Sequence, residues 1–266
     1  MLKVAAYFLM ITFFAGCASS SKMSSPDFAN NPVVAHRGAF KKNGFPENSI
    51  AALKEAIRLG CTGSEFDIRM TADDSLIINH DPHYQKLEIE KVTYKELLPF
   101  PLKNGEAIPT LRQYLLAGMD QNKQTRLILE IKPSGISKER GQIIANKVVA
   151  LVKELKAEKM SAYISFDYDI VKRVHAIDPA AITQHLNGDI DPFQLKKDGI
   201  SGLDYNMAVF RKMPEWISSA KAQKLQLNAW TVNKKEDLQW FLEAGFDFIT
   251  TNEPELLLEM WGERKR

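Results

Sequence analysis

Short runs of apolar, β-branched residues alternate along the chain with longer amphipathic stretches. The first run, residues 33–36, precedes residues 48–60, where apolar side chains recur at helical spacing. Asn48 or Ser49 can cap this helix, and Gly60 can end it. The same alternation continues to the last apolar run and a final helix that begins at Pro254. Strands that alternate with helices in this way predict a parallel sheet built from βα units.

Nine strand-like runs are found in total: residues 33–36, 64–70, 75–81, 126–131, 162–166, 182–186, 202–206, 225–232 and 246–251. Only four residues join the second and third runs, which is too short for a crossover helix, so this unit is distorted. Residues 84–108 form an excursion before a helix that Thr110 can cap, and we expect it to shape a substrate pocket. The pattern predicts an α/β fold, a distorted TIM (β/α)₈ barrel, in one domain over residues 32–262.

The N-terminus has the pattern of a bacterial secretory signal. Lys3 precedes an apolar run, and the segment Phe14-Ala-Gly-Cys17 resembles a lipobox, in which the signal is cut before a cysteine that is then lipidated. We therefore predict a lipoprotein signal peptide over residues 1–16, and lipidated Cys17 with a flexible tether over residues 17–31. The protein would then be a periplasmic or outer-membrane lipoprotein of the bacterial cell envelope, attached to the membrane through this lipid. An uncleaved anchor and a plain signal peptide are the alternatives.

Composition narrows the candidate partners. The 266 residues carry a formal net charge of +2, and this near-neutral balance gives no electrostatic argument for binding nucleic acid. With Cys17 lipidated, Cys61 is the remaining cysteine, so no internal disulfide is expected. Cys61 is predicted to be a small buried residue rather than a reactive thiol.

Ionisable side chains stand at the ends of several predicted strands, where a barrel gathers its catalytic groups. Glu65 and Asp67 share one face of a strand because alternate residues point to the same side, and Glu130 and Lys132 share a face in the same way. Carboxylate oxygens from Glu65, Asp67 and Glu130 suit Ca²⁺ or Mg²⁺ better than zinc. We therefore predict one divalent cation, Ca²⁺ or Mg²⁺, at this site.

The remaining groups suit a phosphodiester substrate, which carries negative charge and has a poor leaving group. Arg37 can hold two phosphate oxygens through its planar guanidinium, and Lys132 can act as a point charge. His36 and His80 are candidates for general acid and base, because an imidazole with a pKa of about 6.5 serves either role near neutrality. Together these groups predict a metal-assisted phosphodiester hydrolase.

The order of the motifs resembles the glycerophosphodiester phosphodiesterase family over essentially the whole domain. The matching motifs are His36-Arg37-Gly38, Pro46-Glu47-Asn48, Glu65-x-Asp67, His80-Asp81, Glu130-Ile-Lys132 and Trp230-Thr-Val-Asn233. The resemblance implies a distorted TIM barrel that releases glycerol 3-phosphate and an alcohol with the help of a divalent ion. It implies catalytic roles for His36 and His80, metal binding by Glu65, Asp67 and Glu130, phosphate contacts from Arg37 and Lys132, a supporting role for Glu47, and an aromatic pocket wall from Trp230.

Two other functions remain open from the sequence. A lysophospholipase D-like hydrolase would accept an acyl chain, and an apolar groove over residues 84–108 would favour it. A barrel without catalytic activity could bind phosphodiesters or sugars at the cell surface. The segments after His80-Asp81 and around Asn252 differ from common family patterns, so the sequence does not identify the alcohol that is released.

Overall fold

The computed structural model describes residues 26–264. The predicted signal peptide and Cys17 lie outside these residues, as does most of the predicted tether. Within the described range, no helix has the length and apolar character needed to cross a bilayer.

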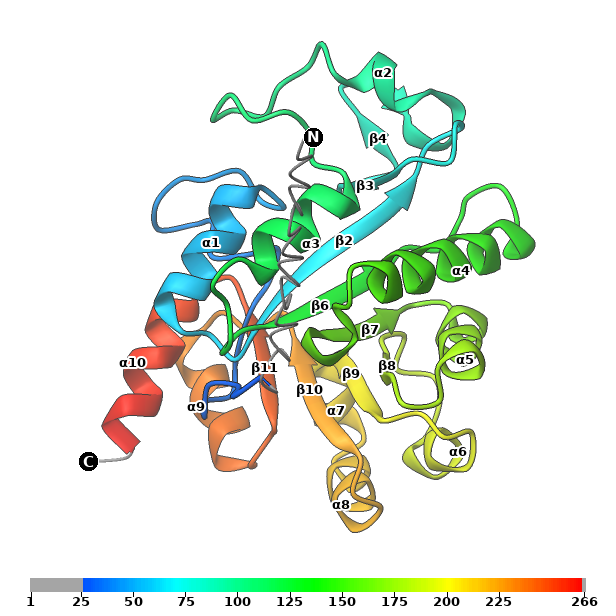
Figure 1. Cartoon of the computed structure of the whole chain (residues 1–266). Coiled ribbons are helices and arrows are strands. Elements are labelled where there is room, and N and C mark those ends of the chain that lie inside the picture. Colours follow the sequence, from blue (N-terminus) through cyan, green and yellow to red (C-terminus); the bar gives the residue numbers. More distant parts are fainter. Residues whose placement is uncertain (1–25, 265–266) are drawn as a thin grey trace, which may run out of the picture.

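Eight parallel strands form a closed barrel (Figure 1). Each strand pairs in parallel with the next one around the barrel, and β1 closes it by pairing with both β2 and β11. The predicted (β/α)₈ fold is therefore confirmed. The barrel strands are β1 (Val33–Ala35), β2 (Gly63–Met70), β6 (Arg126–Ile131), β7 (Ser161–Ser165), β8 (Ile182–His185), β9 (Gly202–Asn206), β10 (Gln226–Trp230) and β11 (Phe248–Thr251).

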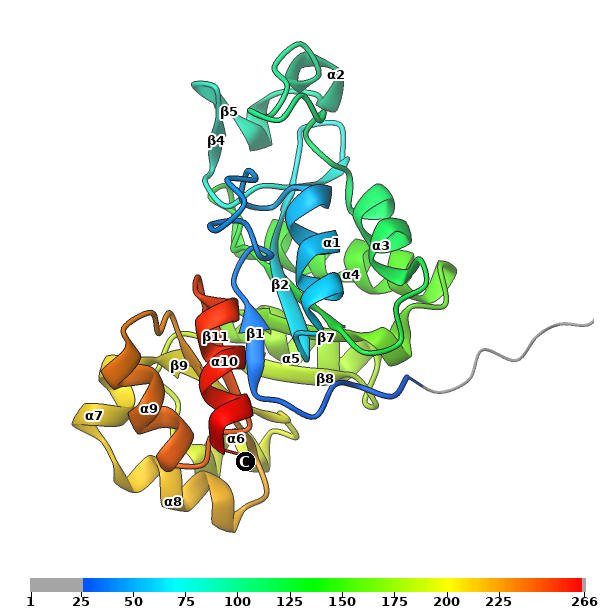
Figure 2. The same cartoon turned by 90° about the vertical axis from the view of Figure 1, so that its left-hand side faces the viewer.

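Helices surround the barrel and cover the apolar outer face of its strands, and α10 lies beside β1 (Figure 2). The alternation of apolar runs and amphipathic stretches predicted nearly all of these helices. One short helix, α7, was not predicted, because six residues are too few to show a helical period. The helices are α1 (Ile50–Leu59), α3 (Leu111–Met119), α4 (Lys138–Glu154), α5 (Tyr168–Ile177), α6 (Pro192–Lys197), α7 (Met207–Lys212), α8 (Glu215–Ala222), α9 (Lys235–Glu243) and α10 (Pro254–Arg264), with a short 3₁₀ helix η2 (Glu158–Met160).

The caps of two helices follow the sequence prediction. The Ser49 hydroxyl accepts a hydrogen bond from the backbone N–H of Ala52 at 3.0 Å, and Gly60 ends α1 in the left-handed conformation with φ 73°. Thr110 begins α3 with a capping box that includes Gln113. These caps fix where the chain leaves one strand and returns to the next.

The unit after β2 departs from an ideal barrel, as the short connection predicted. β3 (Leu76–Ile78) pairs with β2 in antiparallel orientation, and the excursion holds β4 (His83–Tyr84), β5 (Leu87–Glu88), the 3₁₀ helix η1 (Ile89–Lys91) and α2 (Tyr94–Leu97). The excursion projects beyond the strand ends in both cartoon views (Figures 1 and 2). Glu90 ties it to the loop after β6 by accepting hydrogen bonds from the Ser134 hydroxyl at 2.6 Å and the Gly135 N–H at 2.7 Å.

The end of the segment predicted to be a flexible tether is held against the domain. The backbone N–H groups of Asp27 and Ala29 donate to the carbonyls of Lys123 and Gln124, and the side chain of Asn31 donates to the Gly60 carbonyl. Because these backbone groups are paired, the ordered domain begins a few residues before the predicted boundary at residue 32.

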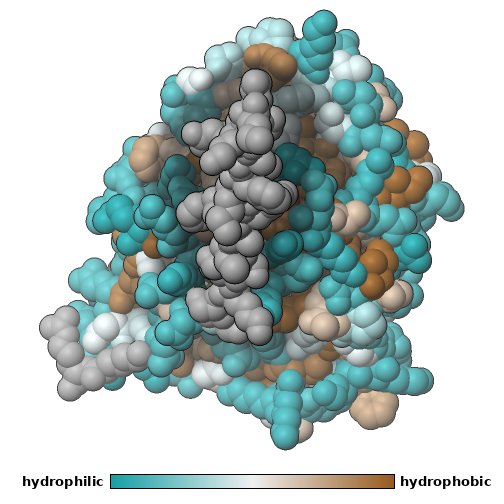
Figure 3. Space-filling view, viewed as in Figure 1, coloured by the Kyte–Doolittle hydropathy of each residue, from teal (hydrophilic) through white to brown (hydrophobic). Residues whose placement is uncertain are grey.

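The face of the molecule in Figure 3 is mostly hydrophilic, with hydrophobic side chains scattered among the polar ones. Such single exposed apolar residues are normal on a folded protein. Across the described chain, the large apolar residues that are exposed are Leu98, Phe100, Leu116, Ile136, Ile143 and Phe193.

Candidate active site

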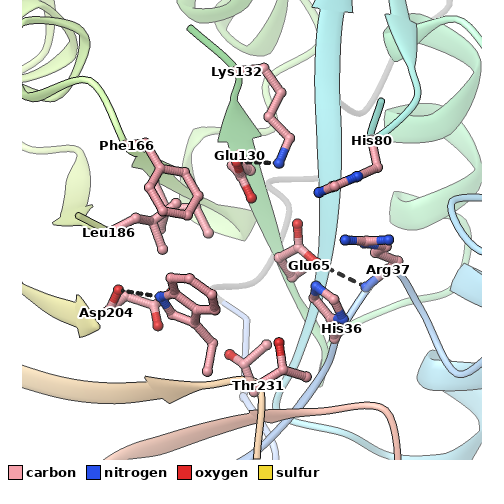
Figure 4. Close-up of a pocket in the computed structure, with 13 residues that line it drawn as sticks. His36, Arg37, Glu65, His80, Glu130, Lys132, Phe166, Leu186, Asp204 and Thr231 are labelled. Carbon is pink, nitrogen blue, oxygen red and sulfur yellow. Dashed lines mark hydrogen bonds and ion pairs between the residues drawn. The ribbon is translucent and has the colours of Figure 1, made fainter. Parts of the chain in front are cut away.

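A cavity of about 100 Å³ opens at the carboxyl ends of the barrel strands (Figure 4). Residues predicted from the sequence come together around it although they are far apart in the chain. The lining residues are His36, Arg37, Glu65, His80, Glu130, Lys132, Ile164, Phe166, Leu186, Asp204, Trp230, Thr231 and Thr250.

Three buried carboxyl groups form a cluster at one side of this cavity. Glu65 and Asp67 come from β2, Glu130 comes from β6, and one oxygen of each lies within 4.8 Å of the others. The strand register produces this arrangement, because Asp67 lies opposite Glu130 in the β2–β6 pair. Glu65 Oε2 accepts the backbone N–H of Arg37 at 2.9 Å, whereas its buried Oε1 has no hydrogen-bond partner among the described residues. An unpaired buried carboxylate oxygen and an all-oxygen donor set fit a hard divalent cation.

Lys132 is the buried cation that neutralises part of this cluster. Its Nζ lies 2.7 Å from Asp67 Oδ1 and 2.5 Å from Glu130 Oε1. Burial would raise the pKa of the Asp67 carboxyl, but Lys132 and a hydrogen bond from Asn48 lower it to about 2. Burial acts to lower the pKa of Lys132, and the facing carboxylates of Asp67 and Glu130 raise it above its usual value. Asp67 and Lys132 are therefore both charged at neutral pH.

The other two carboxyl groups of the cluster, those of Glu65 and Glu130, lack enough nearby positive charge to stabilise their ionised forms. Burial, followed by the charge of Asp67, raises the pKa of Glu65 well above its usual value. Burial and Asp67 also raise the pKa of Glu130 to about 7, even with Lys132 beside it. The cluster therefore has more negative groups than Lys132 alone can balance, and a bound dication would supply the missing positive charge.

Arg37 lies where β1 ends and is fixed by backbone and side-chain contacts. It adopts a positive φ of 55°, and the following Gly38 has φ 79°. A Cβ on Gly38 would lie 2.6 Å from the backbone of Ala52, so only glycine fits there. Arg37 Nη1 donates to both oxygens of Glu47 at 3.0 and 2.9 Å, and its Nε lies 3.5 Å from Asp67. Glu47 itself does not line the cavity, and its contact with the site is through Arg37.

His36 presents one free ring nitrogen to the cavity. Its Nδ1 lies 2.7 Å from the Asn252 side-chain oxygen, which can only accept, so Nδ1 donates and Nε2 is left as an acceptor. Asn252 is held in turn by its N–H, which donates to Asn233. Burial, together with the charge of Arg37, lowers the pKa of His36 to about 4. The imidazole is therefore neutral at pH 7 and able to take a proton.

His80 also lines the cavity, and the Arg37 side chain lies between His80 and His36 in Figure 4. Its Nδ1 lies 2.7 Å from the exposed Asp81 carboxylate, so Nε2 is again free. Arg69 donates from Nε and Nη2 to the His80 backbone carbonyl at 2.9 and 2.7 Å. Arg69 lies on β2, two residues after Asp67. The strand that carries two of the metal-ligand candidates therefore also positions the His80 imidazole.

Sequence reasoning missed several parts of the site. Asn48 was a candidate helix cap, but Ser49 takes that role. The Asn48 amide instead donates to Asp67 Oδ2 at 2.8 Å and accepts the Asp67 N–H at 3.1 Å. The excursion over residues 84–108 was expected to shape the pocket, but none of its residues lines the cavity because it docks against the loop after β6. The far wall is formed by Ile164, Phe166, Leu186 and Asp204, none of which was a candidate site residue from the sequence.

Cys61 is buried, as predicted, and burial raises the pKa of its thiol to about 12.

The fold and the groups at the strand ends of the barrel define a (β/α)₈-barrel phosphodiesterase. The model of the glycerophosphoryl diester phosphodiesterase family matches residues 36–256. The chain therefore belongs to this family, and the enzyme class predicted from the sequence is confirmed.

Individual relatives agree with this assignment. A glycerophosphodiester phosphodiesterase of Caldanaerobacter subterraneus subsp. tengcongensis is 30% identical over 247 residues, which is 86% of this chain and 96% of the relative. The crystal structure of a glycerophosphodiester phosphodiesterase from Parabacteroides distasonis is 38% identical, with a TM-score of 0.86 over 90% of this chain and 100% of that one. An Oleispira antarctica phosphodiesterase solved with its product sn-glycerol-3-phosphate shares the fold at 21% identity, with a TM-score of 0.74 over 85% and 95% of the two chains.

Proposed function

We propose that this protein hydrolyses glycerophosphodiesters to sn-glycerol 3-phosphate and an alcohol with the help of one divalent cation. The observation that carries the proposal is the buried cluster of Glu65, Asp67 and Glu130. Two of its members, Glu65 and Glu130, line one cavity together with two imidazoles and two cationic side chains. The family and the glycerol-3-phosphate product of the Oleispira antarctica relative support the substrate class.

Glu65, Asp67 and Glu130 would hold the cation, with Ca²⁺ or Mg²⁺ favoured by the oxygen ligands. When bound, the cation neutralises charge on the phosphate and makes the phosphorus a better target for attack. Arg37 and Lys132 line the same cavity and add two positive charges toward the phosphate oxygens. The raised pKa of Lys132 keeps its ammonium charged throughout.

His36 and His80 carry the proton transfers in this proposal. Neutral His36 accepts at Nε2 the proton of the attacking hydroxyl, which belongs to water or to the glycerol C2 position, while that oxygen bonds to phosphorus. The bond from phosphorus to the alcohol oxygen breaks, and His80, as the general acid, donates its Nε2 proton to the departing alkoxide. Attack by water gives sn-glycerol 3-phosphate directly. Attack by the glycerol C2 hydroxyl gives a cyclic phosphate, which water then opens: the water oxygen bonds to phosphorus and loses its proton to His80, the bond from phosphorus to the C2 oxygen breaks, and His36 returns its proton to that oxygen. The hydrogen bond from His36 Nδ1 to Asn252 and that from His80 Nδ1 to Asp81 leave both Nε2 atoms available.

Product analysis tests the proposal. The purified domain is incubated with glycerophosphocholine and Ca²⁺ or Mg²⁺, and the four products that the two alternative cleavages would give are quantified. The expected pair is sn-glycerol 3-phosphate and choline. Release of glycerol and phosphocholine would place the cut on the wrong side of phosphorus. No cleavage of any glycerophosphodiester would refute the proposed activity.

We also propose that Cys17 anchors the enzyme to a membrane of the bacterial cell envelope, after removal of residues 1–16. The support is the lipobox-like segment Phe14-Ala-Gly-Cys17, which lies outside the described residues. Mass analysis of the mature N-terminal peptide tests this, because an acylated Cys17 is expected there. Recovery of an unmodified N-terminus, or of the intact leader, would contradict the anchor.

A further inference from the structure

Asp204 is a buried carboxyl that the proposed reaction does not use. It lies in the middle of β9, is 1% exposed, and lines the same cavity as His36 and Glu130. Figure 4 shows Asp204 on the side of the pocket opposite His36 and Arg37. Its Oδ1 has no hydrogen-bond partner among the described residues.

The fold alone does not explain this carboxyl. Burial of a polar group without a partner costs stability, so an apolar side chain would serve the barrel better at this position. The indole N–H of Trp230 donates to the backbone carbonyl of Asp204 at 2.8 Å, so the Asp204 side chain is not needed to orient Trp230. Asp204 is also outside the group of carboxyls whose oxygens could share a cation. The Asp204 side chain has a hydrogen bond with the side chain of Asn228, but its Oδ1 has no partner among the described residues. That oxygen is therefore free to bind part of the substrate.

The chemistry of the site selects a hydroxyl group as its ligand. A phosphate oxygen carries negative charge and would be repelled by Glu130 and by an ionised Asp204. A hydroxyl can donate to a carboxylate and can both donate to and accept from a neutral carboxyl, so it pairs with Asp204 in either state. The neighbouring wall of Phe166, Leu186 and Trp230 is mainly apolar and suits the carbon atoms that bear such a hydroxyl.

We infer that Asp204, with Leu186 and Trp230, forms a subsite that binds a hydroxyl of the glycerol part of the substrate. The inference deepens the proposed function and rests on it. Because Asp204 is buried in the cavity, it would contact the glycerol, which is the part that all glycerophosphodiesters share. The alcohol, which varies between substrates, then extends toward the open mouth of the cavity.

Ligand binding tests the subsite without requiring turnover. Calorimetry in the presence of Ca²⁺ compares sn-glycerol 3-phosphate with ethyl phosphate, a phosphate monoester that lacks both hydroxyls. The wild-type protein is expected to prefer glycerol 3-phosphate. Asp204→Leu is expected to weaken glycerol 3-phosphate by about 10- to 100-fold and to leave ethyl phosphate within about 2-fold, because only the hydroxyl loses a partner. Asp204→Asn, which retains a hydrogen-bonding group, is expected to restore part of the preference.

Leu186→Ala is the matched control, because it removes apolar surface from the same cavity but no hydroxyl partner. It is expected to weaken both ligands to a similar degree. An unchanged ratio of the two affinities in Asp204→Leu, whether both are retained or both are lost, would overturn the inference. Hydrolysis of glycerophosphocholine by the wild-type protein is measured in parallel, so a protein that prefers glycerol 3-phosphate but cleaves nothing would refute the proposed function and keep the subsite.

Discussion

Replacement of Lys132 by methionine is expected to destabilise the cation-free protein strongly. Lys132 is the ammonium that bridges Asp67 and Glu130, at 2.7 and 2.5 Å. The side chains are buried, with exposed fractions of 7% for Lys132, 1% for Asp67 and 8% for Glu130. Methionine keeps most of the length and apolar surface of lysine but removes the charge. The carboxylates are then left without their buried partner.

The size of the effect follows from this burial. Removing one partner of a buried ion pair costs about 3–5 kcal/mol, because the remaining charge is left without compensation. In a domain of roughly this size, each kcal/mol lowers the melting temperature by about 2–4 °C. The Lys132→Met protein is therefore expected to melt about 6–20 °C below the wild type. Ca²⁺ should recover a larger part of this loss than it adds to the wild type, because the dication supplies the missing charge.

The assay is thermal unfolding followed by circular dichroism, with chelator and then with Ca²⁺. Lys138→Met is the matched control, since Lys138 contacts Asp167 at 2.8 Å but its side chain is 68% exposed. Solvent-exposed pairs of this kind contribute little, so this variant should melt close to the wild type. If both lysine variants lost the same small amount of stability in chelator, Lys132 would not be neutralising a buried charge cluster and the reasoning would be wrong.

Three further results are expected. His36→Gln and His80→Gln should each lower kcat for glycerophosphocholine by about 10²- to 10⁴-fold at an unchanged melting temperature, and a parallel loss of stability would point to misfolding instead. Asn48→Ala should weaken cation binding by about 10- to 100-fold in calorimetry, because Asn48 holds Asp67 at two atoms; unchanged affinity would contradict this. Cation binding should release protons near pH 7 and tighten as pH rises from about 6 to 8, because Glu130, with its pKa raised to about 7, must lose its proton first. Calorimetry in buffers of different ionisation enthalpy measures this release, and equal binding heats in those buffers would contradict it.

The sequence was sufficient to predict the barrel because each strand is buried on both faces. That burial requires continuous apolar runs such as residues 126–131, and β6 spans the same residues. The antiparallel β3 could be anticipated as well, since four residues cannot hold a crossover helix. The position of the excursion could not be predicted. It depends on tertiary contacts such as those of Glu90 with the loop after β6.

Part of the candidate site could likewise be predicted from the sequence, and part could not. Groups that break an apolar run at a strand end, such as His36 and Glu130, were visible in the sequence and do line the cavity. Asp204 was not visible, because a single acidic residue within a short strand has no pattern that tells a cavity-facing position from an outward one. Asn48 and Arg69 were missed for another reason. They act by hydrogen bonds to Asp67 and to the His80 carbonyl, which only the folded chain brings near them.

The central claim is that the carboxylate cluster holds a cation on which hydrolysis depends. Chelator-treated protein is titrated with Ca²⁺ and, separately, with Mg²⁺, and each sample is measured twice, for heat of binding and for the rate of sn-glycerol 3-phosphate release from glycerophosphocholine. We predict one bound ion per chain for the activating metal, with activity rising along the same binding curve, and neither signal in a Glu65→Ala, Asp67→Ala double variant. Full activity in the chelator-treated protein, or in the double variant, would contradict the account.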